Sequence, residues 1–167
     1  RERDFSGVVV VSEGGKILHA EATGPADRVF GAPNYLRTRF QIASVSKLFI
    51  SVCVLRLADE RRLNLDDHLD RYLTELPQAI GRLTIESLLL HTSGLPSEAE
   101  FRPWESLSSA EHVRRISALQ PDPAMAGRYR YSNSGYVLLA GVIEAVSGMS
   151  YEEFLARELL APAGLAD

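Results

Sequence analysis

The stretch FQIASVSKLFISV, residues 40–52, places Ser44 three residues before Lys47 at the start of an apolar run. The 167-residue chain has only two lysines among its 18 Lys and Arg residues. Side chains three residues apart lie on one face of a helix, so the amine of Lys47 can reach the hydroxyl of Ser44. A serine needs a base to take its proton, and a lysine can be that base where its neutral amine is favoured, whereas an arginine stays protonated. The spacing therefore makes Ser44 a candidate nucleophile.

Two alternatives stay open for this stretch. Lys47 can be a solvated lysine near the N-terminus of a helix, with no catalytic role. Ser46 is a competing nucleophile, but it lies one residue from Lys47 and points elsewhere on a helix. The helix start also presents free backbone N–H groups and a positive dipole end, which suit a developing oxyanion.

A second candidate group is Tyr131-Ser132-Asn133, within the stretch GRYRYSNSGY. A tyrosine hydroxyl beside an ammonium group loses its proton more readily and can carry a proton between reacting groups. An asparagine side chain can donate to a substrate carbonyl and accept from an amide or an ammonium. The alternative is that Ser132 and Asn133 cap the next helix while Tyr131 packs.

Composition excludes several classes of function. The formal net charge of −4 is spread along the chain, which disfavours nucleic acid as a partner. Apolar runs are too short for a transmembrane helix, and the single Cys53 is expected to be a small core residue. The histidines do not form metal-ligand pairs, and an acidic loop around His68 is better explained as a solvated cap than as a cation site. The sequence therefore predicts no metal and no cofactor.

The expected elements begin with strands and continue with helices. Residues 7–12 and 16–23 are predicted strands, joined by a glycine-rich turn as a hairpin, and residues 24–38 are a predicted loop. A helix is expected over residues 44–60. The residues predicted to share its apolar face are Val45, Leu48, Phe49, Val52 and Leu55.

Helix-capping signals mark the rest of the chain. Thr84 is expected to cap a short helix to residue 90, and capping boxes open helices at Ser108 and Ser150 that run to about residues 119 and 160. An apolar helix over residues 134–147 ends at Gly148, and a single helical turn is expected near residues 66–69. Strands followed by helices predict an α/β (α+β) fold.

Four segments together resemble the serine β-lactamase and penicillin-binding protein superfamily. They are FSGVVVVSEGGKIL, RFQIASVSKLF, LTIESLLLHTSGLP and YSNSGYVLLAGVIEAVSG. They occur in the family's order and span nearly the whole chain from Phe5. The resemblance is strongest to the branch that contains class C β-lactamases, D-Ala-D-Ala carboxypeptidases and esterases.

The resemblance implies a β-lactamase/transpeptidase-like sandwich with an antiparallel sheet and an inserted all-helical subdomain. Residues 1–62 would be the hairpin and nucleophile helix, residues 63–148 the helical subdomain, and residues 149–167 a helix leading back toward the sheet. The family's third motif, K-T-G or H-T-G on a later strand, does not occur in this sequence. We therefore expect the C-terminal sheet strands to be missing and the chain to be the N-terminal portion of a longer hydrolase.

The resemblance also implies roles for individual residues. Ser44 would be the acylated nucleophile, with its own backbone N–H as one oxyanion donor, and Lys47 would activate it. Tyr131 would be the proton carrier, and Asn133 would orient the substrate and Lys47. His91, in the segment HTSGLP, is expected to be structural rather than catalytic.

The implied function is a serine hydrolase that forms an acyl-enzyme with a β-lactam, a D-Ala-D-Ala peptide or a carboxylic ester, in the periplasm or outside the cell. The alternative is a non-catalytic binding or scaffold member of the same fold that lacks the third motif. An open sheet edge further predicts a homodimer formed by strand pairing.

Overall fold

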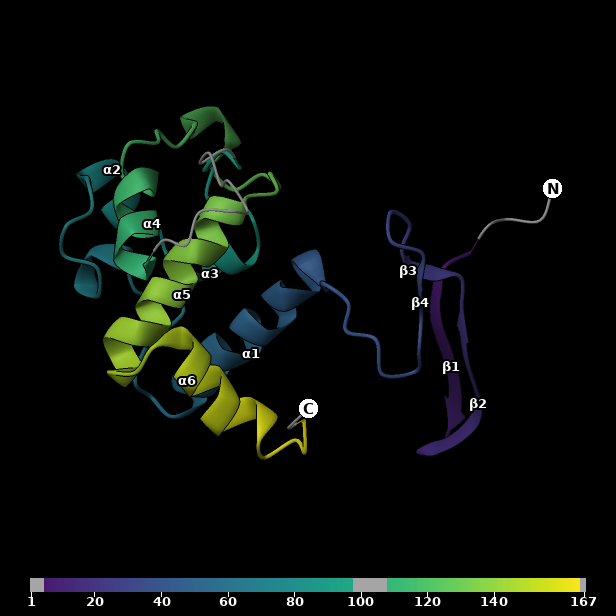
Figure 1. Cartoon of the computed structure of the whole chain (residues 1–167). Helices are drawn as coiled ribbons and strands as arrows, with labels where there is room; N and C mark the ends of the chain where they lie inside the picture. Colours follow the sequence, from purple (N-terminus) through teal and green to yellow (C-terminus); the bar gives the residue numbers. More distant parts are fainter. Residues whose placement is uncertain (1–4, 98–107, 166–167) are drawn as a thin grey trace. The chain divides into compact units, whose positions relative to one another are not determined.

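The computed structural model describes residues 5–97 and 108–165 (Figure 1). The chain divides into two compact units, Arg1–Ala43 and Ser44–Asp167, which are described separately below. The boundaries predicted after residues 62 and 148 stay predictions.

The N-terminal unit is built on a β-hairpin. Strand β1 (Gly7–Glu13) pairs antiparallel with β2 (Lys16–Thr23). The two turn residues, Gly14 and Gly15, have φ values of +55° and +79°. Positive φ at both central positions defines the tight turn that best matches the twist of paired strands, and glycine adopts it without steric cost. The predicted hairpin is confirmed.

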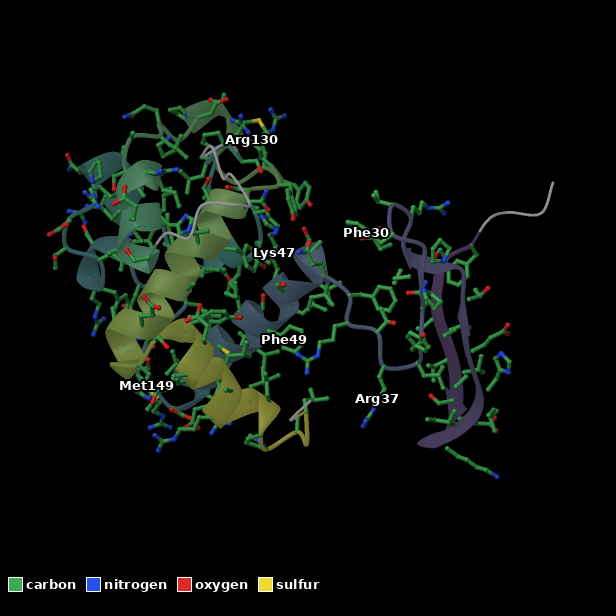
Figure 2. The ribbon with its side chains drawn as sticks, viewed as in Figure 1. Phe30, Arg37, Lys47, Phe49, Arg130 and Met149 are labelled. Atoms are coloured by element: carbon green, nitrogen blue, oxygen red, sulfur yellow. The ribbon has the colours of Figure 1, made fainter. Side chains whose placement is uncertain are left out.

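A second, smaller sheet lies within the segment predicted to be a loop. Strands β3 (Pro25–Asp27) and β4 (Ala32–Pro33) pair antiparallel, so the prediction of a loop over residues 24–38 is wrong here. The reason is a side chain that organises the turn: the Asp27 carboxylate accepts the N–H groups of Val29 and Phe30 at 2.7 and 2.9 Å. Phe30 itself is 86% exposed (Figure 2).

The second unit is helical over its described residues. Its helices are α1 (Ser46–Asp59), α2 (Gln78–Gly81), α3 (Ile85–Leu89), α4 (Ser109–Ile116), α5 (Asn133–Ser147) and α6 (Tyr151–Leu155). Its other helical turns are η1 (Ala43–Val45), which begins in the first unit, η2 (Leu69–Arg71), η3 (Pro123–Met125) and η4 (Ala156–Leu160). The short α2 has no counterpart among the predicted helices.

The predicted helix signals work as expected. The hydroxyls of Thr84, Ser108 and Ser150 each accept the backbone N–H three residues later, at 3.2–3.3 Å. These contacts satisfy N–H groups that have no partner inside the helix. Gly148 ends α5, as predicted.

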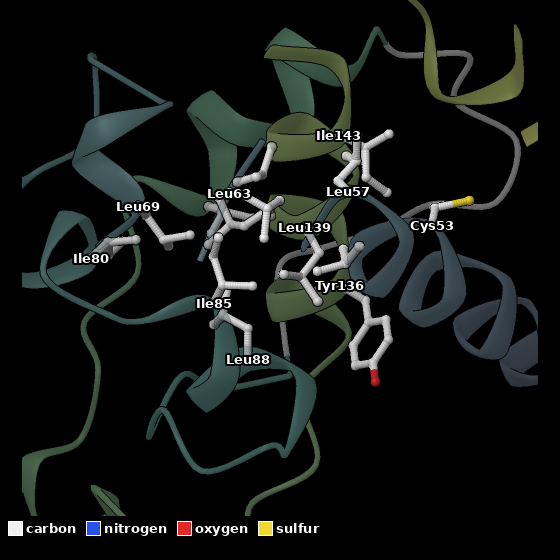
Figure 3. Packing of buried hydrophobic residues seen from close by; sticks show 14 of the residues in the cluster. Cys53, Leu57, Leu63, Leu69, Ile80, Ile85, Leu88, Tyr136, Leu139 and Ile143 are labelled. Carbon is white, nitrogen blue, oxygen red and sulfur yellow. The ribbon is translucent and has the colours of Figure 1, made fainter. Parts of the chain in front are cut away.

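The hydrophobic core of this unit surrounds α5, which contacts α1, α3, α4 and α6 (Figure 3). Fully buried side chains from these helices and from the loops between them meet there. They include Leu57, Leu69, Ile80, Ile85, Leu88, Leu138, Leu139 and Ile143. In the part of the chain that the structure describes, no helix is both long and apolar enough to cross a membrane.

The buried face of α1 is not the face that the apolar pattern singled out. Cys53, Val54 and Leu57 are buried, whereas Leu48 is 65% exposed. Helix α1 has apolar residues on more than one side, so periodicity alone does not identify the side that packs against α5. The expectation that Cys53 is a core residue is confirmed, and burial raises the pKa of its thiol to about 11 although Arg56 opposes the shift.

Candidate active site

Ser44 lies in η1, the helical turn that leads directly into α1. Its side chain is exposed. The residue before it, Ala43, has a φ of +46°, a conformation that a residue with a Cβ rarely adopts. Such strained positions occur mainly where the surrounding structure fixes a functional group. Ser44 is therefore held at a sharp turn at the start of a helix, with its hydroxyl accessible.

The structure brings the four predicted site residues together. The Oγ of Ser44 lies 2.7 Å from the hydroxyl of Tyr131. Lys47 lies in the first turn of α1 (Figure 2). Its Nζ donates to Ser44 Oγ at 3.4 Å and to Asn133 Oδ1 at 2.7 Å. Residues 86 and 87 positions apart in the sequence thus form one hydrogen-bonded group. Lys47 and Asn133 lie in the first turns of α1 and α5, and Ser44 and Tyr131 lie just before these helices.

Lys47 controls the electrostatics of this group. Its Nζ lies 4.8 Å from the ring centroid of Tyr131 and 5.6 Å from that of Tyr136. The interaction with Lys47, and then the hydrogen bond with Ser44, lower the pKa of the Tyr131 hydroxyl below its ordinary value of 10. A positive charge favours the phenolate form of a nearby tyrosine. The phenolate form of Tyr131 is thus more accessible than that of an ordinary tyrosine.

The turn that contains Tyr131 is fixed by the start of α5. The hydroxyl of Ser132 caps this helix by accepting the N–H of Gly135 at 3.2 Å, and Asn133 is the first helical residue. The capping interpretation is therefore confirmed for Ser132. It does not compete with a site at Asn133, because the Asn133 side chain is free to accept from Lys47 while the backbone begins the helix.

Two features of the site were missed from the sequence. Tyr136 lies beneath Lys47, and its hydroxyl donates to Leu89 O at 3.0 Å. It follows Asn133 by three residues on α5, so helical spacing could have placed it on the same face. The second feature is the segment of residues 91–97, which makes hydrogen bonds to Ser132 and Asn133. The spacing of these residues in the sequence does not predict these contacts.

A pocket of about 420 Å³ lies next to Lys47 and Asn133. Its walls come from α1, α4, α5 and α6, and they combine apolar side chains with a few polar ones. Residues that line it include Ser46, Ile50, Tyr136, Val137, Tyr151 and Glu152. Ser46 thus faces this pocket, and the hydrogen bond of Tyr131 goes to Ser44.

In the acidic loop around His68, Asp67 makes structural hydrogen bonds within the loop and to η2 and the residue after it. The Asp67 carboxylate accepts the Tyr72 hydroxyl at 2.5 Å, the Arg71 guanidinium at 2.7 Å and the Asn64 N–H at 2.8 Å. Within residues 5–97 and 108–165, no group of His, Cys, Asp and Glu is arranged to hold a metal ion.

This fold and this site define the class of protein. The family model for beta-lactamase matches residues 1–167, and the chain belongs to the beta-lactamase family. Its structure shares the β-lactamase/transpeptidase-type fold of its structural neighbours, so the predicted family and the predicted fold class are confirmed.

Particular relatives are penicillin-binding proteins and hydrolases. The chain is 35% identical to penicillin-binding protein 4* of Bacillus subtilis (strain 168), over 98% of this chain and 38% of that protein. It is 31% identical to a teichoic acid D-alanine hydrolase of Staphylococcus aureus, over 89% of this chain and 37% of that protein. The chain therefore spans less than half the length of these relatives.

Solved structures of hydrolases and related proteins are also similar to this chain. The crystal structure of FmtA from Staphylococcus aureus superposes with a TM-score of 0.87 at 27% identity, over 98% of this chain and 46% of that one. D-amino acid amidase from Ochrobactrum anthropi SV3 superposes with a TM-score of 0.80 at 27% identity, over 94% of this chain and 44% of that one.

Proposed function

We propose that the protein is a serine hydrolase that works through a covalent acyl-enzyme on Ser44. The observation that supports this most directly is the contact of Ser44 Oγ with the Tyr131 hydroxyl at 2.7 Å, beside the Lys47 ammonium at 3.4 Å. A nucleophile within hydrogen-bond reach of a base, with a third group that orients the base, is the arrangement that covalent catalysis requires.

Acylation begins when Tyr131, as the phenolate, takes the proton of Ser44. The Oγ of Ser44 bonds to the substrate carbonyl carbon and forms a tetrahedral oxyanion. The backbone N–H of Ser44, at the head of α1, is a donor suited to that oxyanion. When the intermediate collapses, the bond from carbon to the leaving group breaks, and the proton on Tyr131 passes to the departing amine or alkoxide.

Deacylation repeats these steps with water. Tyr131 takes a proton from a water molecule, the hydroxide bonds to the acyl carbon, and the bond from carbon to Ser44 Oγ breaks. The proton returns to Ser44, which restores the starting state. Lys47 keeps the phenolate form of Tyr131 accessible, and Asn133 holds Lys47 in place by accepting a hydrogen bond from its Nζ at 2.7 Å.

The names of the relatives support a proposal for the substrate class. Their names refer to penicillin binding, to hydrolysis of D-alanine from teichoic acid, and to amides of D-amino acids. All of these are attacks on an ester, amide or β-lactam carbonyl. We propose a β-lactam, a D-alanyl peptide or a carboxylic ester as substrate.

Covalent labelling of the full-length protein tests this proposal. Wild type, Ser44→Ala and Ser46→Ala are incubated with a fluorescent penicillin and with a fluorophosphonate. We expect an adduct on wild type and on Ser46→Ala, and none on Ser44→Ala. Equal labelling of Ser44→Ala and wild type would contradict the assignment of the nucleophile.

The same experiment tests the non-catalytic alternative. A wild-type protein that forms no adduct, but binds penicillin reversibly in calorimetry, would be a binding member of the family and not an enzyme.

A further inference from the structure

His91 occupies an unusual backbone position at the end of α3. Its N–H donates to Leu88 O at 3.2 Å, and the N–H of Thr92 donates to Ser87 O at 2.8 Å. These two hydrogen bonds form a Schellman motif, in which the residue at the position of His91 adopts a left-handed conformation and is usually glycine. His91 does adopt it, with a φ of +58°. A bulky residue at a backbone position that favours glycine indicates that its side chain has a functional or structural role there.

The imidazole of His91 lies between two tyrosine rings. Its centroid is 4.7 Å from that of Tyr131 and 5.0 Å from that of Tyr136, with interplanar angles of 35° and 34°. Tyr129 packs edge-on at 5.8 Å. Tyr136 is fixed in turn by its hydrogen bond to Leu89 O. His91 therefore connects the anchored Tyr136 to Tyr131, the residue that contacts Ser44.

His91 also holds the backbone of the turn. Its Nδ1 accepts the N–H of Ser132 at 3.1 Å, and its carbonyl oxygen accepts the N–H of Arg130 at 2.8 Å. Because the Ser132 N–H is a donor, Nδ1 must be without a proton, and the neutral ring carries its proton on Nε2. The neighbouring Pro96 O accepts the Ser132 hydroxyl at 3.0 Å.

We propose that His91, as a neutral imidazole, is a positioning residue that holds Tyr131 and Asn133 in place against Ser44 and Lys47. Its ring packs at a tilt against the Tyr131 ring, and its Nδ1 accepts the N–H of Ser132, the residue between Tyr131 and Asn133. This inference deepens the proposed function of the site and rests on it. His91 does not contact Ser44 in the reaction and acts through the turn.

The proposal predicts a specific pH dependence. The titratable groups that face His91 are Lys47 from α1, Tyr129 and Tyr131 from the segment before α5, and Tyr136 from α5. Burial first, and the charge of Lys47 second, lower the pKa of His91 below its ordinary value of 6.5. Protonation at acid pH places a proton on Nδ1, which removes the acceptor for Ser132 N–H and repels Lys47. The site is expected to loosen as the pH falls through this lowered pKa, which lies below 6.5.

Two substitutions separate positioning from a merely structural role. His91→Gly suits the left-handed backbone position but removes both the stacked ring and the acceptor. We expect its melting temperature to stay close to that of wild type, because relief of the left-handed strain offsets the lost contacts, while the rate of Ser44 labelling falls roughly 10- to 100-fold. His91→Asn also tolerates this conformation and keeps an oxygen that can accept the Ser132 N–H, so it should recover part of the rate.

The measurement is the rate of fluorophosphonate labelling of the full-length protein between pH 5 and pH 8. Protonation of His91 should lower the labelling rate of wild type at acid pH. This decrease should be absent in His91→Asn and present in the control His19→Asn, which changes an exposed histidine. Wild-type rates and pH profile in His91→Gly and His91→Asn would overturn the proposal.

A readout without activity separates this inference from the proposed function. If wild type is not labelled at Ser44, the proposed function fails, and nitrogen-15 NMR of the His91 ring still tests the placement. The expected state at pH 7 is a proton on Nε2 and none on Nδ1. A proton on Nδ1 would overturn the role of His91.

Discussion

The two compact units of the chain differ in what they bury. Among the residues that the structure describes, the fully buried members of the hydrophobic core lie between Cys53 and Phe154, in the helical unit. In the N-terminal unit, the apolar strand residues Val10 and Ile17 are more than half exposed. The hairpin is thus defined by strand propensity and a tight turn, whereas the helical unit is defined by packing. All four candidate site residues belong to the packed unit, so we expect site geometry to depend on its core.

The largest expected effect comes from removing the charge next to Ser44. Lys47→Met removes the ammonium that lowers the pKa of Tyr131 and that binds Asn133. The rate of Ser44 labelling is expected to fall by about 10²- to 10⁴-fold. Fluorophosphonate labelling of the full-length protein measures it.

The chain supplies a matched control for this prediction. Lys16, the other lysine, lies in β2 of the N-terminal unit, and Lys16→Met should label at the wild-type rate. Similar losses in both variants would show that the site is not organised by the helical unit.

Core truncation tests the difference between the units directly. Leu139 is completely buried in α5, and Leu139→Ala is expected to lower the free energy of unfolding by about 2–5 kcal/mol. Val10 is 55% exposed, and Val10→Thr keeps a β-branched strand residue, so it should change stability by about 0.5 kcal/mol or less. Urea denaturation measures the free energy of unfolding of both variants. Equal losses would contradict the difference in packing between the two units.

Glycine substitution sharpens the same contrast on a smaller scale. A Cβ on Gly94 would lie 2.5 Å from the carbonyl oxygen of Asp122, at a φ of +75°. Gly94→Ala is expected to cost about 2–3 kcal/mol, from backbone strain together with overpacking. Gly14, in the hairpin turn, has no heavy atom within 4 Å of that position, so Gly14→Ala should cost about 1 kcal/mol from strain alone. Thermal unfolding of both variants measures the two losses. Equal losses would contradict the tighter packing around Gly94.

One further modest effect on stability, at Asp67 in the helical unit, depends on pH. The Tyr72 hydroxyl, the largest cause, lowers the pKa of Asp67 below its ordinary value of 3.8. A carboxyl with a lowered folded-state pKa stabilises the fold above its unfolded value, and this contribution is lost as the pH falls through the folded-state pKa. Asp67→Asn should therefore cost about 1 kcal/mol at pH 7 and less at pH 3. A loss in urea denaturation that is the same at both pH values would contradict the role of the charge.

Local sequence signals predicted most of the elements, and they singled out the four candidate site residues that the structure brings together. The hairpin turn, the capping residues and the three-residue spacing of Ser44 and Lys47 depend on neighbours in sequence, and the structure places these residues as expected. The predictions were wrong where the local structure depends on contacts that the sequence pattern does not reveal. The packed side of α1 is set by α5, and the turn at Asp27 is set by one carboxylate. The contact between His91 and Ser132 joins residues 41 positions apart, which periodicity does not reveal.

The central claim is that Lys47 prepares Tyr131 to take the proton of Ser44, and the titration of Tyr131 tests it most directly. The ring carbon that bears the hydroxyl can be followed by carbon-13 NMR in protein labelled at tyrosine. We predict that Tyr131 titrates below 10 in wild type, and that its pKa rises in Lys47→Met because the ammonium is lost. A Tyr131 that titrates at 10 or above in wild type, with no change in Lys47→Met, would contradict the account.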